Sequence, residues 1–198
     1  MRIIWVVNEL DLEKYMAFIE ESEKLKSVLR TAWTSSGRRE STAEHSWRLA
    51  LLASVMKEYY PELDLSKIIM MCLIHDMGEI YDGDISAALC PDKDDKFEME
   101  YKAAKQVFTL LPERQANQMI DLWLEYNNNA TPEAQLVKAL DKAETIIQHN
   151  QGDNPSDFDY QFNLKYGMEY FKNNEMLEQL RVLIDEKTRK MGSITPSS

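Results

Sequence analysis

Apolar residues recur every three or four positions along most of this chain of 198 residues. The pattern begins in the segment 11–30, where Leu12, Met16 and Ile19 are among the apolar positions. Side chains at this spacing share one face of a helix, so a helix is predicted there. The same pattern predicts further helices from about Ala43 to Pro61, from Asp64 or Ser66 to about Met77, and near residues 96–110, 113–127, 132–150, 158–173 and 175–190.

Two segments interrupt this periodicity. The first, roughly residues 34–40, is rich in Ser and Gly and is predicted to be a linker. Ser41 follows it, and Glu44 stands three residues later, which is the spacing of a capping box at a helix start. The second segment, from about 78 to 95, is rich in Asp, Gly and Pro and is predicted to be irregular.

The run IIMMCLI is apolar nearly all round, and a helix without a polar face belongs in the centre of a domain. The chain has only 6 Gly and 6 Pro, which disfavours barrels and sandwiches with many tight turns. We therefore predict one all-α domain over residues 1–198, a helical bundle with its core at about 11–190 and a flexible tail at 191–198.

The charge balance limits the partners. With 34 acidic and 23 basic residues, the net charge is -11, and such a field repels nucleic-acid polymers and anionic membranes. A small anionic substrate stays possible, because a local basic cluster can outweigh distant charge. The opening MRIIWVVNEL is too short in apolar residues for a signal or a membrane span, and Cys72 and Cys90 suggest no disulfide framework. The predicted location is the cytoplasm.

One dipeptide carries chemistry that packing does not explain. His75 and Asp76 follow the most apolar predicted helix, so an imidazole and a carboxylate enter the interior together. A buried carboxylate needs a cation, a metal or strong hydrogen bonds, and both groups are metal ligands. Glu79 shares their face if the helix continues, and is a candidate acid or base. The alternative is an ordinary helix-end pair with a solvated Glu79.

The wider sequence resembles the HD-domain superfamily of metal-dependent phosphohydrolases. Its pattern is a His, then a His-Asp pair, then a distant Asp, supplied here by the stretches ESTAEHSWRLALLA, CLIHDMGEIYDGDI and KALDKAE. Within the superfamily the chain is similar to the HD-type 5'-deoxynucleotidases. The likeness includes a Trp after an Arg (Arg30 and Trp33), the HDxxE motif and the GDI motif at residues 83–85, and it covers roughly residues 20–150.

This resemblance implies an HD-type helical bundle, a homodimer and specific roles for residues. Glu79 is implied as the acid or base, and Asp84 as a second catalytic carboxylate or a substrate-positioning group. Arg30 and Trp33 are implied to grip the nucleotide and to disfavour a ribose 2'-hydroxyl. One divalent metal (Co, Mn, Zn or Fe, which the sequence does not distinguish) is implied to be held by His45, His75, Asp76 and Asp141.

Asp141 also lies between two lysines. Lys138, Asp141 and Lys142 fall at i, i+3 and i+4, so they share one helical face. They form either surface ion pairs or a metal-bound Asp flanked by cations that attract a phosphate. With the other ligands present, the second interpretation is adopted for Asp141, and Lys138 and Lys142 are candidate substrate-binding residues. His149, Trp47 and Trp123 are interpreted as structural, the two tryptophans as core.

The predicted activity is hydrolysis of a nucleoside 5'-monophosphate, with deoxyribonucleotides preferred. Three alternatives remain open. The first is another HD phosphohydrolase acting on a nucleoside triphosphate, a cyclic nucleotide or an alarmone, because one ligand set serves all of these. The second is a nucleotide sensor that keeps the metal site without turnover. The third is a purely structural helical protein, which leaves the pair of His75 and Asp76 unexplained.

Overall fold

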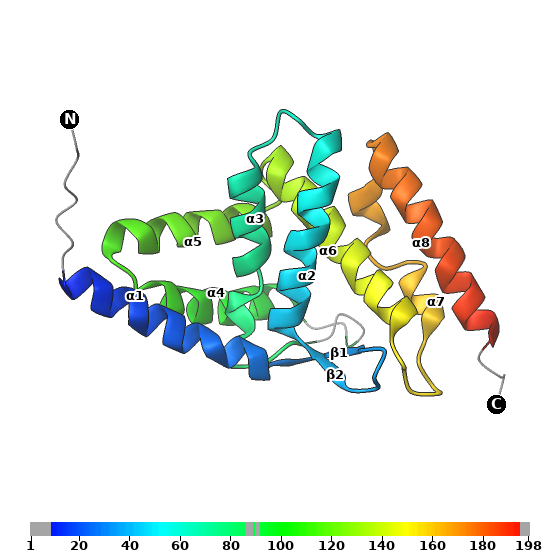
Figure 1. The fold of residues 1–198 in the computed structure, drawn as a ribbon, viewed down its shortest axis with the longest axis horizontal. Coiled ribbons are helices and arrows are strands. Elements are labelled where there is room, and N and C mark those ends of the chain that lie inside the picture. Colours follow the sequence, from blue (N-terminus) through cyan, green and yellow to red (C-terminus); the bar gives the residue numbers. More distant parts are fainter. Residues whose placement is uncertain (1–8, 86–88, 90–91, 195–198) are drawn as a thin grey trace.

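The computed structural model describes residues 9–85, 89 and 92–194, and in them the chain is almost entirely helical (Figure 1). This confirms the predicted all-α fold. Cys90 and the tail residues 195–198 lie outside the described residues, whereas 191–194 continue the last helix. The α-helices are α1 Glu9–Ser22, α2 Thr42–Met56, α3 Leu65–Ile74, α4 Lys93–Phe108, α5 Glu113–Asn127, α6 Pro132–Gln151, α7 Tyr160–Asn163 and α8 Glu175–Ile194.

Short 3-10 helices extend or connect several of these elements. They are η1 Glu23–Ser27, η2 Lys57–Tyr59, η3 Met77–Glu79 and η5 Met168–Phe171. The predicted helix at 158–173 is therefore two short pieces, α7 and η5. The physical reason is Gly167, which has φ +65° between them and breaks the helical conformation.

A small hairpin replaces the predicted linker and the end of the first predicted helix. Strand β1 Leu29–Trp33 pairs antiparallel with β2 Arg39–Ser41. The guanidinium of Arg39 reinforces the pairing by donating to the carbonyls of Leu29 and Arg30, both at 2.8 Å. The side-chain amide of Gln148 on α6 donates to the Trp33 carbonyl at 2.6 Å. The hairpin is thus attached to α6, which orients Arg30 on β1.

The core lies where α2, α3 and α6 pack together (Figure 1). Helix α6 is the most deeply buried element, with twelve buried residues along its length. Helix α3 is central as predicted, since Ile68, Met71 and Cys72 are fully buried. Its opposite face is not covered, because Met70 and Leu73 are 36% and 42% exposed. The prediction from the apolar run, that this helix is enclosed on all sides, is therefore correct for only one of its faces.

The two tryptophans interpreted as core differ. Trp123 on α5 is 1% exposed and packs with Phe97 and Tyr101 of α4, as expected for a core residue. Trp47 on α2 is 62% exposed, so its assignment to the core was wrong. Trp47 faces away from α3 and α6, and helical spacing alone does not tell which apolar face a neighbour covers.

Close backbone packing brings α4 to the end of α3. Gly78 in η3 lies against α4 so closely that an added Cβ would stand 2.7 Å from the Glu100 backbone oxygen. Any larger residue would push α4 away from His75 and Asp76. Within residues 9–85, 89 and 92–194, no helix combines the length and the apolar character that crossing a membrane requires.

Candidate metal centre and substrate cavity

Four predicted ligands from three helices converge in the core. His45 comes from the first turn of α2, His75 and Asp76 follow the end of α3, and Asp141 lies in the middle of α6. The His45 Nε2 atom is 3.2 Å from Asp141 Oδ1 and 3.9 Å from Asp76 Oδ2. The His75 Nε2 atom is 3.1 Å from Asp76 Oδ2 and 4.0 Å from Asp141 Oδ1.

The two Nε2 atoms have the environment that a metal requires. Each is buried and makes no hydrogen bond within the described part of the chain. Each also faces a carboxylate oxygen, and the ligand atoms of His45, His75 and Asp76 lie within 4.8 Å of one another. Buried polar atoms are rarely left unpaired, and two imidazoles with two carboxylates form a suitable donor set for a divalent transition metal. The residues present therefore fit the metal.

The outer nitrogen of each imidazole is hydrogen-bonded. The Nδ1 atom of His45 is in contact with Glu144 Oε2 on α6, and the Nδ1 atom of His75 is 2.9 Å from the Cys72 carbonyl oxygen. A proton on Nδ1 in each case leaves Nε2 with its lone pair free. Both rings therefore present Nε2, with its lone pair free, to the same group of carboxylates.

The two carboxylates are held from other elements. Asp141 Oδ2 accepts from the Tyr126 hydroxyl at 2.6 Å and from Lys142 Nζ at 2.9 Å. Asp76 Oδ2 accepts from the Arg30 guanidinium at 3.4 Å. Arg30 also donates to the Thr145 hydroxyl at 2.9 Å. The two carboxylates are thus oriented by strand β1 and by helices α5 and α6, and for Asp141 the bonds to Oδ2 leave Oδ1 facing the imidazoles.

The cluster favours a bound cation. Burial opposes ionisation of Asp141, but Lys142 and the imidazoles hold the pKa of its carboxyl well below its usual range. Burial also opposes protonation of His45, yet the carboxylates of Glu144 and Asp141 raise the pKa of this imidazole to about 10. Either a proton on the ring or a divalent metal neutralises such a group of carboxylates.

A cavity of about 380 Å³ opens onto this cluster. That volume falls in the range of small-molecule sites, roughly 300–1,000 Å³. Five acidic and four basic side chains surround it, together with four aromatic rings. The lining residues are Arg30, His75, Asp76, Glu79, Asp84, Ile85, Lys96, Phe97, Glu100, Tyr126, Asn127, Lys138, Asp141, Lys142, Tyr166 and Tyr170.

Glu79 is a buried carboxyl beside the proposed ligands. It is 6% exposed and accepts a hydrogen bond from the Thr42 hydroxyl at 3.3 Å. Burial, and then the nearby charges of Asp76 and Asp84, raise the pKa of Glu79 well above its usual value. The side chain is therefore placed to hold a proton inside the cavity, as a general acid must.

Three lysines face the same space. Lys138 Nζ donates to the Asn127 carbonyl at 3.3 Å and lies 4.2 Å from the centre of the Tyr126 ring. Burial, with the nearby Lys142, lowers the pKa of Lys138 to about 8. Together with Lys142 and Lys96, it gives the cavity a basic wall in a protein of net charge -11.

Not every predicted substrate contact reaches the cavity. Trp33 is not among the described residues that line it, and its ring packs edge-on against Phe158 at a centroid distance of 6.2 Å. A smaller cavity of about 60 Å³ shares Arg30 and Asp84 with the first. His149 lines this smaller cavity, is buried, and its Nδ1 atom is 2.9 Å from Asn163 Oδ1.

Sequence reasoning missed several residues of the site. Lys96 and Glu100 form an i, i+4 ion pair of 3.2 Å on α4, and only the packing at Gly78 brings that pair to the cavity. Glu144 follows Asp141 by three residues, so the sequence alone places it near the site. Its contact with His45 on α2 could not be predicted in the same way, because it joins two separate helices. Glu40 is also buried, with a carboxylate oxygen 3.5 Å from Arg30 Nε.

Comparison with known proteins gives a consistent result. The family model described as "HD domain" matches residues 22–181. The chain is 36% identical over 138 residues to human 5'-deoxynucleotidase HDDC2, covering 69% of this chain and 67% of the relative. The Dictyostelium discoideum protein of that name is 34% identical, with 69% and 76% covered.

A solved structure is also similar. It is the crystal structure of a predicted metal-dependent phosphohydrolase from Magnetospirillum magnetotacticum MS-1, at 32% sequence identity and a TM-score of 0.80. The alignment covers 95% of this chain and 100% of that one. The likeness thus extends over both the fold and the segments that carry the four converging side chains.

Proposed function

The chain belongs to the HD domain family, and from that premise we propose that it is a metal-dependent phosphatase acting on nucleoside 5'-monophosphates, with deoxyribonucleotides preferred. The observation that carries this proposal is the pair of buried Nε2 atoms of His45 and His75, which make no hydrogen bond in the described residues and face two carboxylates beside a cavity with a wall of lysines. The proposed domain extends over residues 1–198, with its core at about 11–190.

The proposed cofactor is one divalent metal (Co, Mn, Zn or Fe) held by His45, His75, Asp76 and Asp141. When bound, such a metal neutralises phosphate charge and lowers the pKa of an attacking water from about 16 toward 7. The protein supplies the remaining steps. Tyr126 and Lys142 keep Asp141 oriented, and Arg30 does the same for Asp76.

Glu79 is the proposed acid. Because its pKa is raised, it holds a proton that it can give to the 5'-oxygen as the nucleoside leaves. Asp84 lines both cavities, and we assign it to positioning the sugar or assisting the proton transfer. Neither residue is among the proposed metal ligands, so their loss should affect turnover rather than metal retention.

The proposed phosphate contacts are Arg30, Lys138 and Lys142, all of which line the cavity. Cationic donors form strong hydrogen bonds to phosphate oxygens, and a guanidinium does so with two parallel bonds. Trp33 remains the residue proposed from sequence to disfavour the 2'-hydroxyl. Because the Trp33 ring packs on Phe158 and is not part of the described cavity lining, we propose that it acts on the sugar indirectly, through the β1 backbone and Arg30.

The decisive experiment measures phosphate release from dAMP and from AMP, first with EDTA and then with added Co or Mn. Restoration by metal with faster release from dAMP supports the proposal. Equal release from both keeps the phosphatase and rejects the deoxyribose preference. Nucleotide binding without release under any metal rejects catalysis and favours a sensor.

We also propose that the protein is a cytoplasmic homodimer. Trp47, Leu51 and Val55 form an apolar stripe on α2, at 62%, 53% and 62% exposure, and such stripes mark interaction surfaces. Cys72 is a free thiol, as is usual in a reducing compartment. Light scattering should give twice the mass of the chain, and Trp47→Lys should reduce it to the monomer. A wild-type monomer at micromolar concentration would reject the dimer.

A further inference from the structure

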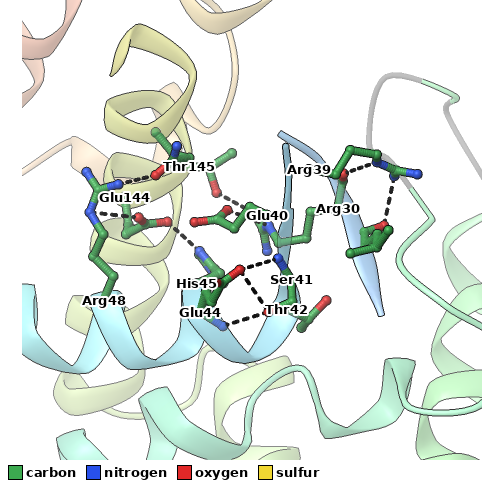
Figure 2. Close-up of polar contacts among 12 residues, drawn as sticks. Arg30, Arg39, Glu40, Ser41, Thr42, Glu44, His45, Arg48, Glu144 and Thr145 are labelled. Atoms are coloured by element: carbon green, nitrogen blue, oxygen red, sulfur yellow. Dashed lines mark hydrogen bonds and ion pairs between the residues drawn. The ribbon is translucent and has the colours of Figure 1, made fainter. Parts of the chain in front are cut away.

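Glu144 is a fully buried carboxylate outside the proposed ligand set. It is 1% exposed and lies on α6, one turn after Asp141. Its Oε2 atom contacts His45 Nδ1 across the interface between α2 and α6, and its Oε1 atom is 3.4 Å from Arg48 Nε (Figure 2). Burying such a charge costs several kcal/mol unless it is compensated, so its position needs an explanation.

The two imidazoles of the cluster differ in what holds them. His75 follows the last turn of α3, where the final carbonyls have no partner within the helix, and its Nδ1 uses the Cys72 carbonyl at 2.9 Å. His45 lies in the first turn of α2, where the unpaired backbone groups are N–H donors instead. That end of the helix thus offers unpaired donors rather than unpaired acceptors, and the acceptor that His45 Nδ1 uses is a side chain, that of Glu144.

We propose that Glu144 is the positioning residue of the metal site, which holds His45 in the tautomer and orientation that point Nε2 at Asp141. This inference rests on the proposed metal function. When Glu144 accepts a hydrogen bond from Nδ1–H, the proton stays on Nδ1 and the Nε2 lone pair is left for the metal, and a carboxylate acceptor also makes the ring more basic. The Nε2 atom lies 3.2 Å from Asp141 Oδ1, on the side of the ring away from Glu144.

Arg48 completes the arrangement. Its side chain contacts Gln148 and Gln151, so it joins α2 to the part of α6 that follows Glu144. With one oxygen on His45 and the other near Arg48, the Glu144 carboxylate cannot rotate freely. The orientation of one metal ligand is therefore determined by the packing of two helices rather than by its own helix.

The test compares two substitutions of nearly equal volume. Glu144→Met removes the acceptor, whereas Glu144→Gln keeps a neutral one. Gln151→Met is the matched control, because Gln151 also lies on α6 and its side chain contacts Arg48, whereas Gln148 is unsuitable because it also holds the Trp33 carbonyl of the hairpin. The dissociation constant of Zn is measured by competition with a chromophoric chelator, and thermal melting confirms that each variant is folded.

Glu144→Met should weaken Zn binding by about 10- to 100-fold, the usual effect of losing an outer-shell partner. Glu144→Gln should lose less, and the dissociation constant of Gln151→Met should stay within about threefold of the wild-type value. If the wild type binds Zn and folded Glu144→Met binds it with the same dissociation constant, the proposed role of Glu144 is overturned while the proposed metal function stands. Failure of the wild type to bind any metal would instead reject the proposed metal function.

A second measurement does not depend on the Met variant being stable. The chain has only three histidines, so the ring protons of the Zn-loaded protein can be assigned by NMR. The Nδ1 proton of His45, bonded to a carboxylate, should resonate far downfield and move upfield in Glu144→Gln. The His75 proton should not move. An unchanged His45 resonance would contradict the proposed hydrogen bond.

Discussion

The metal-ligand cluster (His45, His75, Asp76 and Asp141) and the lysine wall (Lys96, Lys138 and Lys142) face the same cavity but are held differently. In the cluster, three of the five outer hydrogen bonds come from another helix or strand, and both imidazoles are 4% exposed or less. In the wall, Lys96 and Lys138 each donate to a backbone carbonyl, of Ile85 and Asn127 respectively, at the end of a flexible stem.

This difference has a physical consequence. Removing one ligand leaves the others with unpaired buried charge, so the metal site should fail as a unit. Removing one lysine leaves two other cations in reach of a phosphate, so the loss should be graded. Substitutions in the two regions should therefore differ in the size of their effect on metal retention and on phosphate release.

The largest effect is expected for a metal ligand. Asp76→Ala should abolish metal retention and lower phosphate release from dAMP by at least about 1,000-fold, because the metal loses one of its four proposed ligands and one negative charge. Metal content by mass spectrometry and phosphate release are the measurements. Asp121→Ala, at an exposed position on α5, is the control. A metal-free Asp76→Ala protein with full turnover would rule out the cluster as the catalytic centre.

Glu79→Gln tests a cavity residue that belongs neither to the metal-ligand cluster nor to the lysine wall. The variant should keep the metal, since Glu79 is not a proposed ligand, but kcat should fall by about 100-fold because no proton donor remains. Metal content and steady-state kinetics distinguish the two effects. A normal kcat would remove Glu79 from the mechanism, and loss of the metal would move it into the ligand cluster.

Lys138→Met should show the graded behaviour of the lysine wall. The KM for dAMP should rise by about 10-fold with kcat within a few-fold of wild type, because one charge-assisted hydrogen bond to phosphate is lost. Lys102→Met, an exposed lysine on α4, should leave KM unchanged. A 1,000-fold fall in kcat/KM for Lys138→Met would contradict the proposed difference between the lysine wall and the metal-ligand cluster.

The wall also predicts a pH dependence. Burial and Lys142 lower the pKa of Lys138 to about 8, so its ammonium is charged below that pH and neutral above it. As pH rises through about 8, kcat/KM for dAMP should therefore fall. The fall should move to higher pH in Lys138→Arg, since a guanidinium stays charged. An unchanged profile in that variant would assign the fall to another group.

Trp33→Phe should have the smallest effect. Because the Trp33 ring packs on Phe158 and is not part of the described cavity lining, the ratio of dAMP to AMP turnover should change by less than about twofold. The ratio is measured from kcat/KM for both nucleotides. Equal turnover of dAMP and AMP in this variant would show that Trp33 does read the sugar.

Much of the fold could be predicted because it depends on neighbours in sequence. Apolar spacing of three and four residues located the helices near 113–127 and 132–150, which the structure gives as Glu113–Asn127 and Pro132–Gln151. Ser41 and Glu44 form the expected capping box, with both reciprocal hydrogen bonds. These features depend on residues that are close in sequence, so the spacing of residue types along the chain is enough to predict them.

The convergence of the four proposed ligands could also be predicted from sequence, through the motif resemblance and the unusual burial of charge at His75 and Asp76. The hairpin was not, because β1 and β2 are stabilised by pairing with each other and by bonds to α6. The exposure of Trp47 was not either, since it depends on which face of α2 the other helices cover.

The sequence by itself thus determined the helices, their caps and the chemistry of the ligands, all of which depend on residues a turn or less apart or on an ordered motif. Only the tertiary structure decided that Glu144 supports His45, that Lys96 and Glu100 reach the cavity, and that Trp33 packs on Phe158. The physical reason is that these contacts join separate elements, and their geometry is set by helix packing rather than by local spacing.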